Sequence, residues 1–199
     1  MHIEFLVEEP SMQAALENLL PHLLPAQTTF RILVFQGKRD LLQQLPNRLR
    51  AYAHWLSPDD RIVVLVDEDR QDCHELKRRL EDAARQAGLV TKTSGGARFQ
   101  VLNRIVIEEL EAWFLGDLEA LRQAYPRLPA SLERRFPDPD GVKGGTWETL
   151  ERLLQHYGYF EGGYRKIEAA RTISKYMNPA RNRSKSFQVF RDGLLASIR

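Results

Sequence analysis

The sequence predicts an α/β protein with a mostly parallel four-stranded sheet, helices on both faces and a C-terminal helical extension. Over the first 120 residues, short runs rich in strand formers alternate with stretches of helical periodicity, which is the pattern of βαβ units. One run, RIVVLV at 61–66, is almost unbroken, as in a strand buried on both faces of a parallel sheet. The composition, with 43% hydrophobic and 28% charged residues among 199, is that of an ordinary globular protein.

Four strands are expected, because four short apolar runs contain many β-branched or aromatic residues. They cover residues 2–7 (HIEFLV), 30–35 (FRILVF), 61–66 (RIVVLV) and 99–107 (FQVLNRIVI). A turn at Gly95-Gly96 precedes the last strand. Since helices connect the strands, the crossovers are expected to be right-handed and the strands parallel.

A helix is expected after each strand, because apolar residues there recur at helical spacing. The four stretches cover residues 12–23, 41–53, 73–87 and 110–121. Pro21 and Pro25 are expected to end the first helix, and Pro46 to interrupt or restart the second. Gly88 is expected to close the third.

The pattern changes after Tyr125, where a stretch rich in proline, glycine and charge reads as an irregular connection. Three further helices are expected at residues 146–157, 163–177 and 186–198. We therefore divide the chain into a core of residues 1–125 and an extension of residues 126–199 that packs on it.

Several classes of protein are disfavoured. A single cysteine, Cys73, excludes an intrachain disulfide and a cysteine-type zinc site, and the five histidines lack metal-ligand spacing. No apolar run reaches membrane-spanning length, and the segment MHIEFLVEE has acids where a signal peptide has bases, so we expect a cytoplasmic protein without membrane association. The sequence has no Walker A, G-x-S-x-G or G-x-G-x-x-G motif.

Acidic residues follow three of the four predicted strands, at the sheet edge where ligands bind in open α/β folds. They are Glu8 and Glu9, then Asp67, Glu68, Asp69 and Asp72, then Glu108, Glu109 and Glu111. Carboxylates brought together repel one another unless a cation offsets them. Oxygen-only ligands favour Mg²⁺ or Mn²⁺.

Each acid also has a simpler interpretation. Asp67 and Asp69 are the best candidates for metal ligands, because two acids leaving a central strand exceed what helix capping needs. Asp72 is expected to be a helix cap. Glu8 is equally compatible with the start of the next helix, and Glu111 with a solvent-facing helix position.

Basic residues offer candidate phosphate contacts. Lys38 follows the second strand, although a glycine turn with a solvated lysine is the more common interpretation of Gly37-Lys38. Lys143 lies in a Gly-rich segment that is equally compatible with a flexible turn. Residues 164–199 hold nine Lys or Arg against two acids. This excess of positive charge indicates that the tail binds polyanions or, alternatively, that it is a pair of helices with solvated basic side chains. The proposed nucleic-acid contacts in this tail are Arg181, Arg183 and Lys185.

Four motifs together resemble a known family. They are V-E-x-P-S after the first strand, F-Q-G-K after the second, V-D-x-D-x-x-D-C after the third and E-L-E-A-W-F-x-x-D after the fourth. They are similar to the bacterial Toprim-like proteins of the domain-of-unknown-function family numbered four thousand two hundred and seventy-six. Near the C-terminus, R-S-K-S-F-Q-V-F (183–190) is similar to that family's R-x-x-S-F.

Toprim domains occur in topoisomerases, primases and the overcoming-lysogenization-defect nucleases. The resemblance implies a Toprim-like core in which Glu8 acts beside a Mg²⁺ site of Asp67 and Asp69, with Glu111 as a further ligand and Lys143 near the scissile phosphate. Such nucleases usually have E-G-x-x-E after the first strand, and this chain has Glu9 and Met12 in place of the glycine and the second glutamate.

The sequence therefore predicts a Mg²⁺-dependent Toprim-like nuclease, with Glu8 as general acid or base and the basic tail on the nucleic-acid backbone. The resemblance also implies an ABC- or AAA-type ATPase partner and a role in phage defence. The alternative, favoured by Met12, is a non-catalytic module that binds nucleic acid or such an ATPase. A phosphatase of the D-x-D-x-T type is disfavoured, because Gln71 occupies the threonine position. The sequence leaves DNA versus RNA and the oligomeric state open.

Overall fold

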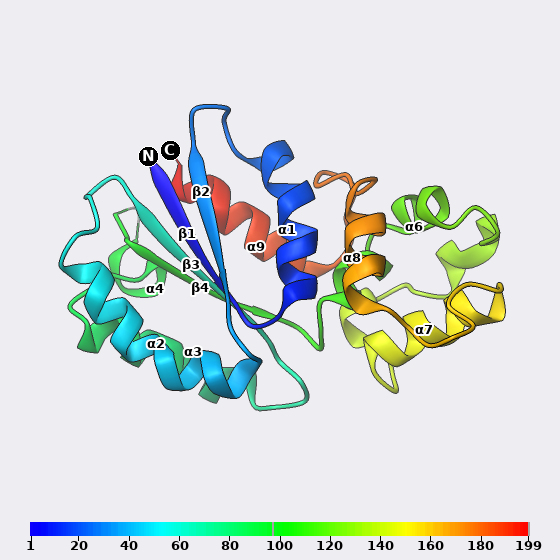
Figure 1. Cartoon of the computed structure of the whole chain (residues 1–199), viewed down its shortest axis with the longest axis horizontal. Coiled ribbons are helices and arrows are strands. Elements are labelled where there is room, and N and C mark those ends of the chain that lie inside the picture. Colours follow the sequence, from blue (N-terminus) through cyan, green and yellow to red (C-terminus); the bar gives the residue numbers. More distant parts are fainter. Residues whose placement is uncertain (97, 199) are drawn as a thin grey trace. The chain divides into compact units, whose positions relative to one another are not determined.

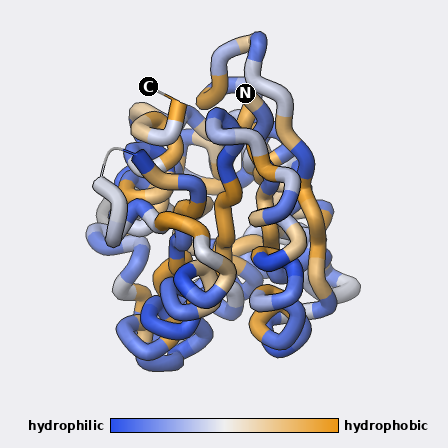
Figure 2. The backbone as a smooth tube through the Cα atoms, turned by 90° about the vertical axis from the view of Figure 1, so that its left-hand side faces the viewer, coloured by the Kyte–Doolittle hydropathy of each residue, from blue (hydrophilic) through white to orange (hydrophobic). Residues whose placement is uncertain are grey.

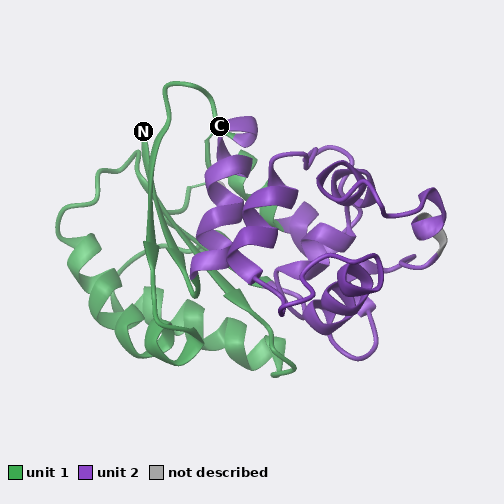
Figure 3. Ribbon diagram, turned by 45° about the vertical axis from the view of Figure 1, so that its right-hand side comes forward, with its two compact units in different colours: residues 1–9, 24–105, 190–199 green, residues 10–23, 106–189 purple. Residues whose placement is uncertain are grey.

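The computed structural model describes residues 1–96 and 98–198. These form two compact units, neither of which is continuous in sequence (Figure 3). Unit 1 comprises residues 1–9, 24–105 and 190–199, and unit 2 comprises residues 10–23 and 106–189. This division does not follow the sequence boundary at residue 125, because the first helix of the chain belongs to unit 2.

Unit 1 is built on a four-stranded parallel sheet with strand order β2-β1-β3-β4, which confirms the predicted fold class. The strands are β1 (His2–Val7), β2 (Thr29–Val34), β3 (Arg61–Asp67) and β4 (Val101–Val106). β1 pairs with β2 from His2↔Thr29 to Val7↔Val34, and with β3 from Ile3↔Arg61 to Val7↔Leu65. The carboxyl ends of β1, β2 and β3 therefore meet at one edge.

The central strands are apolar on both sides. Nearly every residue of β1 and β3 is buried, whereas β2 at the edge of the sheet is partly exposed. In Figure 2 the strands are strongly hydrophobic and the segments around them are mostly hydrophilic.

Helices cover both faces of the sheet, as predicted. On one face lie α2 (Lys38–Ala53) and α3 (Cys73–Gln86), side by side in Figure 1. Their buried leucines share a core with the residues of β1, β3 and β4 that point to that face. On the other face, the end of α9 (Lys185–Ser197) lies against β4, where Gly193 leaves room for the side chain of Arg104. The short α4 (Lys92–Gly95) precedes β4.

Unit 2 is helical. It contains α1 (Pro10–Leu23), α5 (Glu111–Leu115), α6 (Leu118–Ala124), α7 (Thr146–His156), α8 (Lys166–Ser174) and the start of α9, with 3₁₀ turns at Ala130–Arg134 and Pro139–Gly141. α1 packs on α8, and the Asn18 amide of α1 donates to the Arg171 carbonyl (3.1 Å) and the Ser174 hydroxyl (2.9 Å). None of the helices described is both long and apolar enough to cross a membrane.

Two predictions about prolines were wrong. α1 continues through Pro21 and ends at Leu23, before Pro25 as expected, and α2 runs unbroken through Pro46. A proline inside a helix costs about 3 kcal/mol. Burial of the leucines on the inner face of each helix outweighs that cost, because each buried leucine contributes about 1.5–3 kcal/mol.

Two predicted helix limits also differ. The expected helix at 110–121 is two short helices, α5 and α6, separated at Gly116 and Asp117. Asp117 caps α6 by accepting from the Ala120 amide (3.2 Å), so a new helix starts there. The expected helix at 163–177 is shorter, Lys166–Ser174.

Candidate functional site

The candidate site lies at the carboxyl edge of the sheet in unit 1. Backbone pairing between the first two strands continues beyond their ends, since Phe35 N–H donates to the Val7 carbonyl and Gly37 N–H to the Glu8 carbonyl, both at 2.9 Å. Gly37 has φ +90°, a left-handed conformation that glycine adopts without strain, and α2 starts at the next residue. Lys38 is thereby held beside the residues that follow β1.

Glu8 and Asp67 lie side by side at this edge. The Glu8 carboxylate accepts a hydrogen bond from the backbone N–H of Asp67, with 3.3 Å between Oε2 and N. Asp67 is the last residue of β3 and its side chain is buried. The structure thus brings together two of the acids that the sequence singled out.

Asp69 is engaged by a lysine. The Lys38 ammonium lies 2.8 Å from Asp69 Oδ2 and donates to the Glu68 carbonyl at 2.9 Å, and only 9% of the Lys38 side chain is exposed. Asp69 and Arg70 both have positive φ, 49° and 60°, so the chain turns sharply after β3. Sequence reasoning had Lys38 as a possible phosphate contact but missed this ion pair.

The electrostatics of the edge centre on Glu8. Burial raises the pKa of its carboxyl group from 4.5 to about 7, and the negative charge of Asp69 adds to the effect. The positive charge of Lys38 and the hydrogen bond from the Asp67 amide oppose it. A carboxyl group with a pKa near neutrality can both release and accept a proton at physiological pH.

The carboxylates at this edge can be compared with the ligands that a divalent metal ion requires. In the part of the chain that the structure describes, no three His, Cys, Asp or Glu side chains are grouped closely enough to hold a metal ion. Mg²⁺ keeps several of its waters and needs only one or two protein carboxylates. The buried Asp67 carboxyl group, with the Glu8 carboxylate held at the backbone N–H of the same residue, fits such an ion, while Asp69 is already paired with Lys38.

Glu111, a predicted metal ligand, lies in unit 2. Its side chain is buried and accepts a hydrogen bond from the Tyr164 hydroxyl (3.3 Å), so the alternative of a solvent-facing acid was wrong. Burial, together with the negative charge of Glu111, raises the pKa of Tyr164 well above its usual value. The apolar residues around Glu111 in α5 place this carboxylate in the interior of unit 2.

Two motifs that carry the family resemblance meet inside unit 2. Trp113 of E-A-W-F donates through its indole N–H to the Ser186 hydroxyl (3.0 Å), and its ring packs on Phe187 at 5.1 Å between centroids. Asp140 accepts hydrogen bonds from the hydroxyls of Ser184 (2.7 Å) and Ser186 (2.9 Å) at the start of α9. These motif residues therefore hold α5 and α9 together.

The basic residues predicted to contact nucleic acid differ in how far other protein groups engage their side chains. Arg181 forms a bidentate ion pair with the buried Asp117 (2.8 and 3.1 Å), and Arg183 donates to the Phe136 carbonyl (3.0 Å). Lys185 is exposed at the start of α9. Lys143, the predicted phosphate contact, is exposed in the turn before α7.

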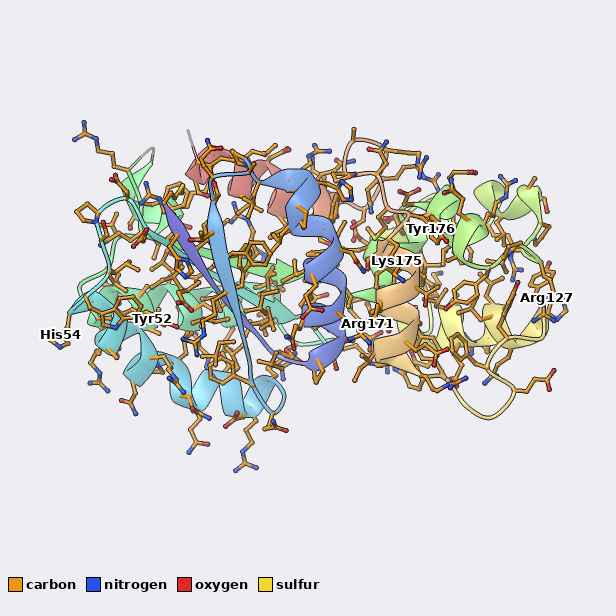
Figure 4. All side chains as sticks on the ribbon, turned by 45° about the horizontal axis from the view of Figure 1, so that its top comes forward. Tyr52, His54, Arg127, Arg171, Lys175 and Tyr176 are labelled. Atoms are coloured by element: carbon orange, nitrogen blue, oxygen red, sulfur yellow. The ribbon has the colours of Figure 1, made fainter. Side chains whose placement is uncertain are left out.

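Other bases of the tail are more available. Arg171 in α8 and Lys175, the residue that follows its end, are both exposed (Figure 4) and line a pocket of 610 Å³. Within the described residues, neither side chain takes part in an ion pair. Their spacing of four residues along a helix could have been read from the sequence.

Helix caps explain two further acids. Asp72 accepts from the amides of His74 (2.8 Å) and Glu75 (3.2 Å) and caps α3, as predicted. Glu109 accepts from the Thr146 hydroxyl (2.9 Å) and the Trp147 amide (3.0 Å) at the start of α7. The capping role of Glu109 was missed, because nothing local in the sequence links positions 109 and 146.

The model of a family described as Domain of unknown function (DUF4276) matches residues 7–195. No curated protein and no solved structure matches the chain.

The raised pKa of Glu8 predicts a pH-dependent effect of Glu8→Gln on stability. Between pH 4.5 and about 7 the folded state holds a proton on Glu8 that the unfolded state has lost, so Glu8 makes the parent progressively less stable as pH rises through this window. Glutamine does not ionise. In chelator, the free energy of unfolding of the variant minus that of the parent should therefore increase from pH 5 to pH 8. Urea titrations at each pH measure both free energies of unfolding. A difference that does not change with pH would show that the pKa of Glu8 is not raised in the folded state.

The ion pair in unit 2 predicts that Arg181→Ala destabilises the protein. The substitution leaves the buried carboxylate of Asp117 without its guanidinium, at a cost of about 1.5–3 kcal/mol, toward the lower end because Arg181 is 40% exposed. Arg171→Ala, which removes an exposed arginine of the same unit, is the control and should change stability little. Equal melting temperatures for the two variants would contradict a structural role for Arg181.

Proposed function

We propose that this chain, which belongs to the DUF4276 family, is a Toprim-like, Mg²⁺-dependent nuclease that cleaves phosphodiester bonds in nucleic acid. One observation carries the proposal. Residues that follow three parallel strands, Glu8 after β1, Lys38 after β2 and Asp69 after β3, lie with Asp67 at a single edge of the sheet. This is the edge at which open α/β sheets bind their ligands.

The side chains have distinct roles in this proposal. Glu8, with its pKa raised to about 7, is the general acid or base that exchanges a proton with the attacking water or the leaving oxygen. Lys38 neutralises Asp69, so that this carboxylate does not repel an approaching phosphate. Mg²⁺ or Mn²⁺, when bound by Asp67 beside Glu8, would stabilise negative charge on the phosphate.

Binding of the substrate involves the basic residues of unit 2 in this proposal. Exposed bases such as Lys185, Arg171 and Lys175 contact the nucleic-acid backbone and position it without reading its sequence. From the family resemblance we also propose a partner ATPase of the ABC or AAA type and a role in phage defence. The sequence has no Walker A motif of its own.

A second candidate is a non-catalytic module that binds nucleic acid or the ATPase. Two observations favour it. Met12, which stands where related nucleases have a second acid, is buried in α1 as an apolar core residue. Asp69 is paired with Lys38 rather than grouped with further acids.

Cleavage assays with matched variants test the proposal. Single-stranded and duplex DNA and RNA are incubated with Mg²⁺, Mn²⁺ or chelator, with and without the partner ATPase. The parent should cut only with metal. Glu8→Gln should slow cleavage by about 10²–10⁴-fold, as expected for loss of a general acid or base. Asp67→Asn should also lose most activity.

Asp72→Asn is the control, because it removes a charge from the same loop while asparagine still caps α3. It should cleave like the parent. A parent that cuts no substrate under any of these conditions, or three variants that cut equally well, would contradict the nuclease assignment. Binding without cleavage would favour the non-catalytic module.

A further inference from the structure

A pocket of 480 Å³ adjoins the candidate site in unit 1. Its lining residues come from α2, from α3 and from the loop between β3 and α3. Its polar lining consists of Lys38, Arg39 and Gln43 from α2, Asp69 and Gln71 from the loop, and Arg79 from α3. Lys38 and Asp69 belong to the edge as well, so the pocket is continuous with the site of the proposed chemistry.

The pocket is positively charged. Three cationic side chains line it against one carboxylate, and that carboxylate is already neutralised by Lys38 at 2.8 Å. The uncompensated charge is therefore that of Arg39 and Arg79, both exposed. Gln43 and Gln71 add amide groups that can donate hydrogen bonds.

Other arginines on α3 differ from Arg79. Arg78 pairs with Glu75 (3.6 Å) and Arg85 pairs with Asp82 (2.8 Å), which is the usual arrangement of bases on a solvated helix face. Glu75 and Asp82 also lie about one turn from Arg79. Within the described residues, however, neither Arg79 nor Arg39 takes part in an ion pair. The pocket thus holds the guanidinium groups that these acids do not neutralise.

We infer that Arg39 and Arg79 hold a phosphate of the nucleic-acid backbone next to the reacting edge. Guanidinium groups bind phosphate oxygens in a bidentate manner, and two of them from different helices make a clamp for a phosphodiester. This inference rests on the proposed function and adds to it a binding position for the strand. Free phosphate and mononucleotides share this chemistry, so the test separates them from an oligonucleotide.

The test compares two double variants with equal loss of charge. Arg39→Ser/Arg79→Ser removes the pocket arginines, and Arg78→Ser/Arg85→Ser removes two paired arginines of α3. Binding of fluorescent single-stranded and duplex oligonucleotides is followed by anisotropy over a range of NaCl concentrations. Chelator is present throughout, so that binding is measured without cleavage. Circular dichroism confirms that both variants fold.

The pocket variant should bind oligonucleotides at least tenfold more weakly than the parent at low salt. For single strands, its slope of log affinity against log salt should be shallower by about 0.7–1.4, which corresponds to one or two lost phosphate contacts. The control variant should stay within about twofold of the parent, with an unchanged slope. If both variants lose the same affinity for oligonucleotides, binding depends only on the total positive charge and the inference is overturned. A parent that binds no oligonucleotide would also overturn it.

Competition with inorganic phosphate and with AMP separates the possible ligands. If AMP binds in a manner that depends on Arg39 and Arg79 while oligonucleotide affinity does not, the pocket serves a small phosphate ligand and the inference is wrong. The outcome for catalysis is independent. A parent whose binding depends on these arginines but which cuts nothing contradicts the nuclease proposal alone, and a parent that cuts but binds independently of them contradicts this inference alone.

Discussion

The structure of unit 1 depends on the parallel, in-register pairing of β1 with β2 and β3. Because β1 lies between the other two, the residues that follow all three strands reach the same edge of the sheet. In an antiparallel sheet they would be divided between two edges. This arrangement brings Glu8, Lys38, Asp67 and Asp69 together, although up to 61 positions separate them in sequence.

Bringing these groups together has an electrostatic cost. A half-buried glutamate beside Asp69 is harder to ionise, and this is why its pKa rises. Lys38 offsets part of the cost through its ion pair with Asp69. A pKa shifted by burial and neighbouring charges is common where proton transfer or ligand binding takes place. Glu8 differs in this respect from the acids elsewhere in the chain that cap helices or form ion pairs.

Much of unit 1 could be predicted from local patterns. Apolar runs placed the four strands, and the position of Asp72 just before a periodic segment identified it as a helix cap. The proximity of Glu8 and Asp67 followed from parallel strand order alone. Pairings between distant residues could not be predicted, because their partners depend on tertiary packing. The Lys38–Asp69 ion pair and the burial of Glu111 are of this kind.

The same limit applies to the basic tail. A count of charges in the sequence treats Arg181 and Lys185 alike. In the structure, Arg181 neutralises the buried Asp117, whereas the Lys185 side chain is exposed. A count of charges therefore does not separate arginines that hold the fold from bases that face solvent. The arginines of α2 and α3 that line the pocket beside the site were not singled out by any local run of charge.

Glu8 shares one electrostatic environment with Asp69 and Lys38. The most direct measurement is an NMR titration of the ¹³C-labelled Glu8 carboxyl group in chelator, assigned by comparison with Glu8→Gln. We expect a midpoint near pH 7 in the parent and a higher midpoint in Lys38→Met, because the lysine charge lowers the pKa of Glu8. A midpoint near the ordinary value of 4.5, unchanged by Lys38→Met, would contradict this expectation.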